Sequence, residues 1–174
     1  MLKKILIAVL VLVAGFLVVA ALQPSDLRVS RSATMSAPAA AVFAQVNDFH
    51  RWEAWSPWAK LDPQAKNSYE GPPAGPGAVF RWAGNREVGE GSMTITDSQP
   101  NERIRIKLDF VKPFAGTNDV EFTFQPQGDQ TQVSWTMSGK KNLLMKAMGL
   151  FVSCDKMIGG RFEEGLAQLK KIVE

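Results

Sequence analysis

Side chains that commonly carry acid–base or nucleophilic chemistry are scarce in this sequence. The chain has one histidine, His50, one tyrosine, Tyr69, and one cysteine, Cys154. General acid–base catalysis needs a titratable group that is tuned toward neutral pH and lies within reach of the substrate. We expect His50 to be exposed beside a tryptophan-rich segment, and Cys154, at the start of the last predicted helix, has no partner histidine that would activate its thiol. We therefore predict no catalytic residue and interpret Cys154 as a small packed side chain.

The acidic residues do not form a metal-binding or acid–base pattern. Glu90, Asp109 and Glu121 fall on outward-facing positions of predicted strands, where we expect them to be solvated. A single cysteine excludes paired-cysteine metal sites, and zinc does not favour a site made almost entirely of carboxylates. The sequence shows no glycine-rich phosphate loop and no Ser/His/Asp set. We predict no metal site and no cofactor.

The charge pattern does not favour nucleic acid as a partner. The formal net charge is +3, and Lys3 and Lys4 near the N-terminus supply two of those charges. Arg103, Arg105 and Lys107 alternate along one strand face, which is short of the concentrated basic stripe that nucleic-acid binding usually needs.

An apolar segment at residues 5–22 precedes the rest of the chain. It contains no charged or polar side chain, and it is longer than the usual signal-peptide core of about 7–15 residues. We therefore predict that residues 1–26 are a single-pass membrane anchor with a short linker. Lys3 and Lys4 place the N-terminus in the cytoplasm and the following domain outside it, as in a bacterial inner membrane facing the periplasm. The alternative is a signal peptide cleaved near Ala21, which would leave a secreted or periplasmic protein.

The element order beyond the anchor predicts an α+β domain at residues 27–174. Residues 27–35 alternate as a strand, and two short helices follow, the second of which carries Trp52 and Trp55. Arg31 interrupts the apolar face of the first strand, either as an edge residue that reaches solvent or as a ligand contact. Residues 78–138 form a run of antiparallel strands with short turns, and residues 155–173 form a long amphipathic helix. Packing this helix on the sheet buries the apolar faces of both.

The order and local sequence resemble the START-like superfamily, also called SRPBCC or Bet v 1-like, and its polyketide cyclase/dehydrase branch. The matching stretches are residues 37–43, 52–58, 75–84, 131–135 and 162–166. The resemblance implies a helix-grip fold, in which a curved antiparallel sheet wraps around the long C-terminal helix and leaves a cavity between them. Members of this superfamily carry lipids, sterols, hormones and polyketides, and a minority are enzymes.

We predict that the domain binds a hydrophobic small molecule or lipid in this cavity. Gly89 and Gly91 fall on one face of a predicted strand, and their missing side chains either leave room for a ligand or mark a bulge. Trp52, Trp55 and Trp58 lie within seven residues of one another. Four roles are open to these tryptophans: they close the cavity, stack on a ligand, insert among lipid headgroups or fill the core. The predicted ligand-binding residues are Trp52, Trp55, Trp58, Phe80, Trp82, Gly89, Gly91, Met93, Phe110, Phe122, Trp135, Met137, Met157 and Phe162.

Two other functions remain open. A cyclase-type enzyme would need a buried polar group facing the cavity, and an interaction or chaperone-like domain would have a filled core instead of a cavity. The oligomeric state and the ligand do not follow from the sequence.

Overall fold

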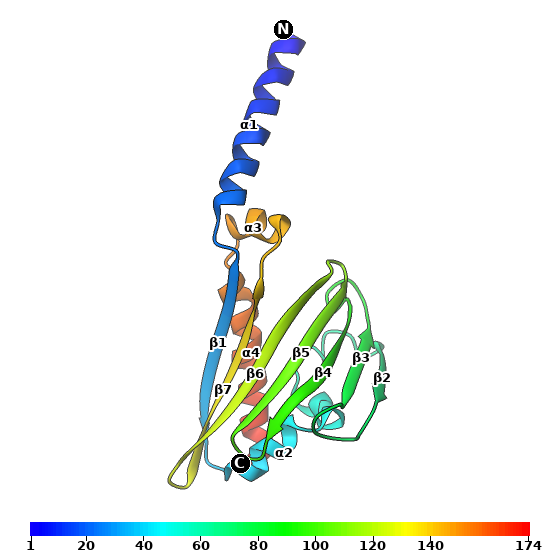
Figure 1. The fold of residues 1–174 in the computed structure, drawn as a ribbon, viewed down its shortest axis with the longest axis vertical. Coiled ribbons are helices and arrows are strands. Elements are labelled where there is room, and N and C mark those ends of the chain that lie inside the picture. Colours follow the sequence, from blue (N-terminus) through cyan, green and yellow to red (C-terminus); the bar gives the residue numbers. More distant parts are fainter.

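Seven antiparallel strands form one curved sheet in the computed structural model, which describes residues 1–174 (Figure 1). The strands are β1 (Asp26–Met35), β2 (Lys66–Glu70), β3 (Val79–Ala83), β4 (Glu90–Gln99), β5 (Arg103–Lys112), β6 (Gly116–Gln127) and β7 (Gln130–Lys140). Their order is β1-β7-β6-β5-β4-β3-β2, so β2 to β7 follow one another as a meander. The first strand joins the last, with Val29 opposite Met137.

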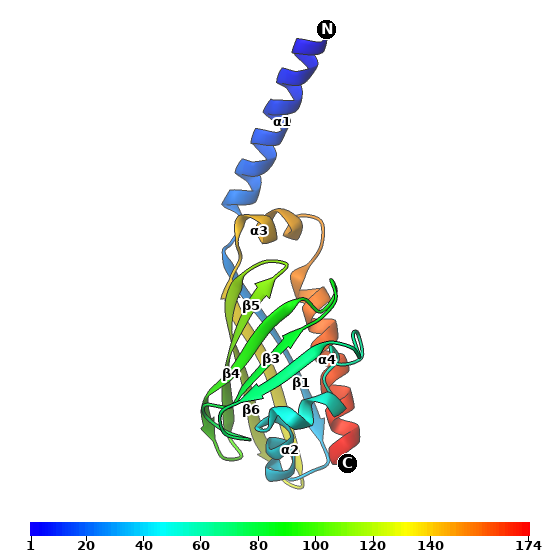
Figure 2. The same ribbon diagram turned by 90° about the vertical axis from the view of Figure 1, so that its right-hand side faces the viewer.

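The long helix α4 (Cys154–Val173) packs along the concave face of this sheet (Figures 1 and 2). Its apolar stripe, Phe162, Leu166 and Leu169, is buried. Ser153 caps the helix by accepting a hydrogen bond from the backbone N–H of Lys156. The helix-grip α+β fold predicted from the sequence is therefore confirmed.

Two short helices cover the sheet at the end where β1 stops, which we call the α2 end. They are α2 (Ala39–Val46) and the 3-10 helix η1 (Phe49–Ala54). Asp48 begins η1 by accepting a hydrogen bond from the His50 backbone N–H at 2.9 Å. Val42, Val46 and Phe49 are buried against the core, so these helices close that end of the domain.

The opposite end of the sheet, which we call the α1 end, carries α1 (Leu2–Leu22) and α3 (Leu143–Gly149). Helix α1 extends away from the domain, and α3 lies across its base (Figures 1 and 2). An 18-residue window of α1 has a mean hydropathy of 3.3, and nearly all of the side chains of α1 are exposed. It is thus long and apolar enough to cross a membrane, a criterion that a signal sequence also meets.

Two features of the fold differ from the sequence analysis. The edge strand β2 lies in a region for which no strand was predicted, since none of its residues is buried and it has no apolar alternation. Arg31 turns toward α4 and forms ion pairs with Asp155 at 2.9 Å and Glu163 at 2.6 Å. The apolar face of β1 therefore tolerates an arginine because its charge is matched by the helix. Arg31 does lie on an edge strand, and its side chain, which is 23% exposed, reaches the two helix carboxylates.

Candidate ligand-binding face

The sheet register arranges the predicted site residues in rows across the concave face. At the α1 end, Gly91 of β4 lies between Trp82 of β3 and Phe110 of β5. The next row joins Phe80, Met93 and Leu108. Toward the α2 end, Phe122 of β6 lies opposite Trp135 of β7. The face therefore runs from one aromatic group near α1 to another near α2.

The group nearer the α2 end is a filled aromatic core made of Trp52, Trp55, Phe122, Trp135 and Phe162. Each of these side chains is at most 4% exposed. The rings of Trp135 and Phe162 are stacked with centroids 4.2 Å apart, and Trp52 and Trp55 lie 4.6 Å apart. Phe122 is 4.8 Å from Trp135. Trp52 and Trp55 are therefore buried in the hydrophobic core.

The group nearer the α1 end is only half-buried, and we call it the apolar wall. It consists of Phe80, Trp82, Met93 and Phe110, which pack on the core without being enclosed by it. The Trp82 ring meets Phe80 at 5.9 Å and Phe110 at 6.1 Å. Ile158 and Cys154, from the first turns of α4, are likewise half-buried. An apolar surface with few polar groups is typical of ligand sites.

The two predicted glycines have separate structural roles. Gly91 is buried, and a Cβ there would lie 2.5 Å from the Trp82 ring and 2.6 Å from the Asp109 carbonyl oxygen. The space left by the missing side chain is thus occupied by Trp82, next to a bulge between Glu90 and Gly91. Gly89 has a φ of +69° in the turn before β4, and a Cβ would lie 2.3 Å from the Lys112 carbonyl oxygen.

The remaining predicted residues lie around these two groups. Met137 is buried in the core, and Trp58 is half-buried with its ring 5.8 Å from Trp135. Met157 is 56% exposed on the first turns of α4, so the structure does not bring it to the concave face with the others.

Polar groups are few within the core. Thr131 is the only buried polar residue, and its hydroxyl donates to the Ala37 carbonyl at 2.7 Å. The indole N–H groups of Trp52 and Trp82 donate to the carbonyls of Val46 and Val88. The buried indole nitrogen of Trp135 has no acceptor. A buried donor without a partner costs free energy, so this N–H would gain from a ligand oxygen or a water beside it.

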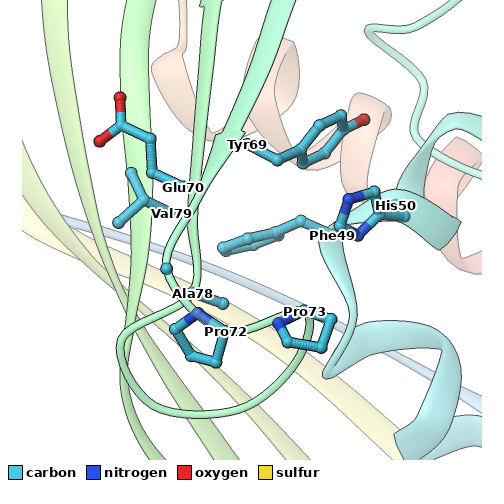
Figure 3. A pocket seen from close by; sticks show the side chains of 9 residues that line it. Phe49, His50, Tyr69, Glu70, Pro72, Pro73, Ala78 and Val79 are labelled. Atoms are coloured by element: carbon cyan, nitrogen blue, oxygen red, sulfur yellow. The ribbon is translucent and has the colours of Figure 1, made fainter.

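His50 and Tyr69 lie outside this face, in a surface hollow of about 200 Å³ beside β2 (Figure 3). Their rings stack with centroids 4.1 Å apart, and Nδ1 of His50 is 2.9 Å from the Asp48 carboxylate. Burial, together with the negative charges of Glu53 and Asp48, raises the pKa of Tyr69. Phe49, Pro72 and Pro73 also line the hollow. Glu70 lines the hollow as well, and its carboxylate forms an ion pair with Arg81 at 2.9 Å.

The sequence matches the family described as "Polyketide cyclase / dehydrase and lipid transport" over residues 26–174. Since this match spans the whole domain, the chain belongs to that family. A comparison with curated proteins found no match.

Solved structures share the same fold at low sequence identity. A solution structure from Thermobifida fusca is 23% identical with a TM-score of 0.63, over 84% of this chain and 92% of the other. A crystal structure of a protein from Chromobacterium violaceum is 18% identical with a TM-score of 0.61, over 87% and 99% of the two chains. Ara h 8.0201 is 9% identical with a TM-score of 0.57, over 85% and 97%. These likenesses establish an SRPBCC or Bet v 1-like fold.

Proposed function

We propose that this domain binds an apolar small molecule or lipid on the apolar wall, while α1 tethers it at the extracytoplasmic side of a membrane. The observation that carries the proposal is the contrast between the two ends of the concave face. Trp55 near the α2 end is fully buried, whereas Phe80, Trp82, Met93 and Phe110 stay half-buried at the α1 end. Covering these four side chains with an apolar ligand would remove them from water, which is favourable.

The family supports the ligand class. Its description names lipid transport beside polyketide cyclisation, and both involve largely apolar molecules. Met93 supports binding of varied shapes because a methionine side chain adapts its rotamers to its neighbours. The ligand then lies between β3, β4 and β5 on one side and the first turns of α4 on the other.

The apolar length of α1 and the basic residues before it support tethering. Lys3 and Lys4 stay on the cytoplasmic side, so the domain that follows α1 lies outside the cytoplasm. A signal peptide cleaved near Ala21 is the alternative, and it would release the domain in the same compartment.

The second candidate function is an interaction domain without a ligand, which the filled aromatic core favours. The rings of Trp135 and Phe162 cover each other's apolar faces without a ligand. The two functions differ in what touches the apolar wall in cells.

In-cell photocrosslinking of the full-length chain would test the proposal. A photoreactive benzoylphenylalanine incorporated in place of Met93 should capture an apolar compound that mass spectrometry can identify. The matched control places the same group at Thr94, whose side chain points to the other face of β4. Capture from position 93 and not from position 94 supports binding on the wall. Equal yields from both positions, or a captured protein in place of a small molecule, would contradict it.

A further inference from the structure

Exposed apolar side chains gather at the α1 end of the domain. Outside α1, every large hydrophobic residue that is exposed lies at this end except Tyr69 and Ile172. We call this surface the α3 patch, and its residues are Val111, Phe114, Leu143, Leu144, Met148, Leu150, Phe151, Val152 and Met157. Phe151 is 79% exposed, and α3 has no buried residue at all. Exposed apolar side chains gathered at one end of a domain are typical of a surface that contacts a partner or a membrane.

Two contacts define the position of this patch along the axis of α1. The rings of Phe151 and Phe16 are stacked with centroids 5.9 Å apart. The Lys146 ammonium donates to the carbonyl of Ala21 at 3.1 Å. From Phe16 to Leu22 an α-helix rises about 9 Å, at 1.5 Å per residue. Phe151 therefore lies beside the apolar length of α1 and not beyond its end.

Helix α3 has two faces suited to such a position. Met145 packs on the hydrophobic core, whereas Leu144 and Met148, four residues apart, share an exposed side, and the exposed Phe151 follows in the turn after the helix. Asn142 caps the helix by accepting from the Met145 backbone N–H at 2.8 Å. Figure 2 shows α3 lying across the base of α1, between α1 and the sheet.

Basic side chains surround the same end and have no carboxylate partner. They are Arg28, Lys141, Lys146 and Lys156, none of which forms an ion pair. Arg28 and Lys141 also line a hollow of about 420 Å³, together with Leu150 and Phe151. Two carboxylates line it as well, and each is already in an ion pair, Asp26 with Lys140 and Asp155 with Arg31. Lysine and arginine beside an apolar surface are attracted to anionic lipid headgroups.

We infer that the α3 patch lies in the interfacial layer of the membrane that α1 crosses, with Phe151 among the acyl chains and the basic residues among the headgroups. This inference rests on the membrane tethering proposed above. The binding partner of the α3 patch is then the lipid bilayer. Trp82 and Phe110 lie in a row close to this same end of the sheet. The proposed ligand surface and the α3 patch are therefore both nearer the membrane end of the domain than the aromatic core is.

The test places an environment-sensitive fluorophore at single cysteines of the full-length chain with Cys154→Ser as background. Phe151→Cys reports on the patch, Leu12→Cys on α1, and Asp129→Cys on the exposed β6–β7 turn at the α2 end. Each protein is reconstituted into vesicles of phosphatidylcholine and phosphatidylglycerol that contain nitroxide-labelled lipid. Quenching at position 151 should exceed that at position 129 several-fold and approach that at position 12.

Labels at positions 12, 129 and 151 distinguish failure of the membrane tether from failure of the membrane contact of the α3 patch. Quenching at 12 with no more quenching at 151 than at 129 overturns the membrane contact of the patch and leaves the tether intact. Absence of quenching at 12 overturns the tether, and the patch inference falls with it. Replacing phosphatidylglycerol by phosphatidylcholine should reduce quenching at 151, and an unchanged value would remove the headgroup role of the basic residues.

Discussion

The guanidinium of Arg31 lies against α4 at the place where residue 159 has no side chain. A Cβ on Gly159 would lie 2.1 Å from Nη2 of Arg31. The close approach lets the Arg31 side chain reach Asp155 and Glu163 on either side of Gly159. One glycine of the helix and one arginine of the strand thus fix where α4 crosses β1, and that crossing positions the first turns of α4 opposite the apolar wall.

Replacing Gly159 by alanine should therefore destabilise the domain. The added methyl group displaces the flexible end of the Arg31 side chain from both carboxylates. Because these ion pairs are exposed and alanine also gains helix propensity at this position, we expect the free energy of unfolding to fall by about 1 kcal/mol or less. The matched control is Gly160→Ala, because nothing lies within 4 Å of a Cβ at Gly160. There the better helix propensity of alanine should raise stability by about 0.5–1 kcal/mol. Denaturant unfolding of both variants measures the difference, and equal effects would refute this packing role.

The same ion pair predicts a dependence of stability on pH. A hydrogen bond and the charge of Arg31 hold the pKa of Asp155 below its usual value of 3.8. Because the folded pKa is the lower one, this contribution is present above about pH 4 and is lost as the pH falls through the folded value. Arg31 remains charged throughout, since its two carboxylate partners raise its pKa.

Arg31→Gln should remove this dependence. The stability difference between wild type and variant should be largest near neutral pH and shrink in acid, as followed by thermal unfolding from pH 6 downward. NMR titration of the Asp155 carboxyl should show its pKa rising in the variant. A difference that stays constant with pH would show that Arg31 acts through packing alone.

Truncation of the aromatic core should cost more stability than truncation of the wall. Phe162→Ala removes the ring stacked on Trp135, and a buried phenylalanine lost in this way costs about 3–5 kcal/mol. Phe110→Ala removes a half-buried ring and should cost less. Equilibrium unfolding of the two variants compares them. A larger loss at Phe110 would mean that the wall is part of the structural core and not a ligand surface.

A methyl group at Gly91 should reshape the wall itself. Gly91→Ala brings a Cβ into the Trp82 ring and against the Asp109 carbonyl, so the ring must rotate away from Phe110. We expect a loss of about 1–3 kcal/mol in stability and a change in the near-ultraviolet circular dichroism of the tryptophans. The spectrum should stay unchanged if Trp82 can retain its position, and that result would count against the close packing described here.

The fold was accessible from the sequence where strands bury one face. The alternation of Ile104, Ile106 and Leu108 predicted β5, and all three side chains are buried. Strand β2 carries no such signal, because Lys66–Glu70 is exposed throughout and is held by backbone pairing to β3, as at Tyr69 and Phe80. A strand that is stabilised by backbone hydrogen bonds to its neighbour, and not by side-chain burial, shows no alternation of apolar residues in the sequence.

The sequence predicted which side chains of the site point toward the concave face of the sheet. It did not predict which of them are enclosed in the core and which stay partly exposed. Trp55 and Trp82 are the same residue type at equally suggestive positions, yet Trp55 is fully buried and Trp82 half-buried. The difference arises from where η1 and α4 rest on the sheet, which involves contacts between residues far apart in the chain. Residues 143–151 are largely apolar in the sequence, whereas their exposure beside Phe16 depends on the packing of α3 against α1.

Native mass spectrometry of the full-length chain, purified from bacterial membranes and released from detergent micelles in the gas phase, tests the central claim most directly. Binding of an apolar ligand predicts a discrete added mass that solvent extraction removes and that Met93→Gln diminishes while Thr94→Gln does not. A spectrum with only the mass of the polypeptide, together with no thermal shift on adding a panel of lipids and aromatic polyketides, would contradict ligand binding and favour an interaction domain.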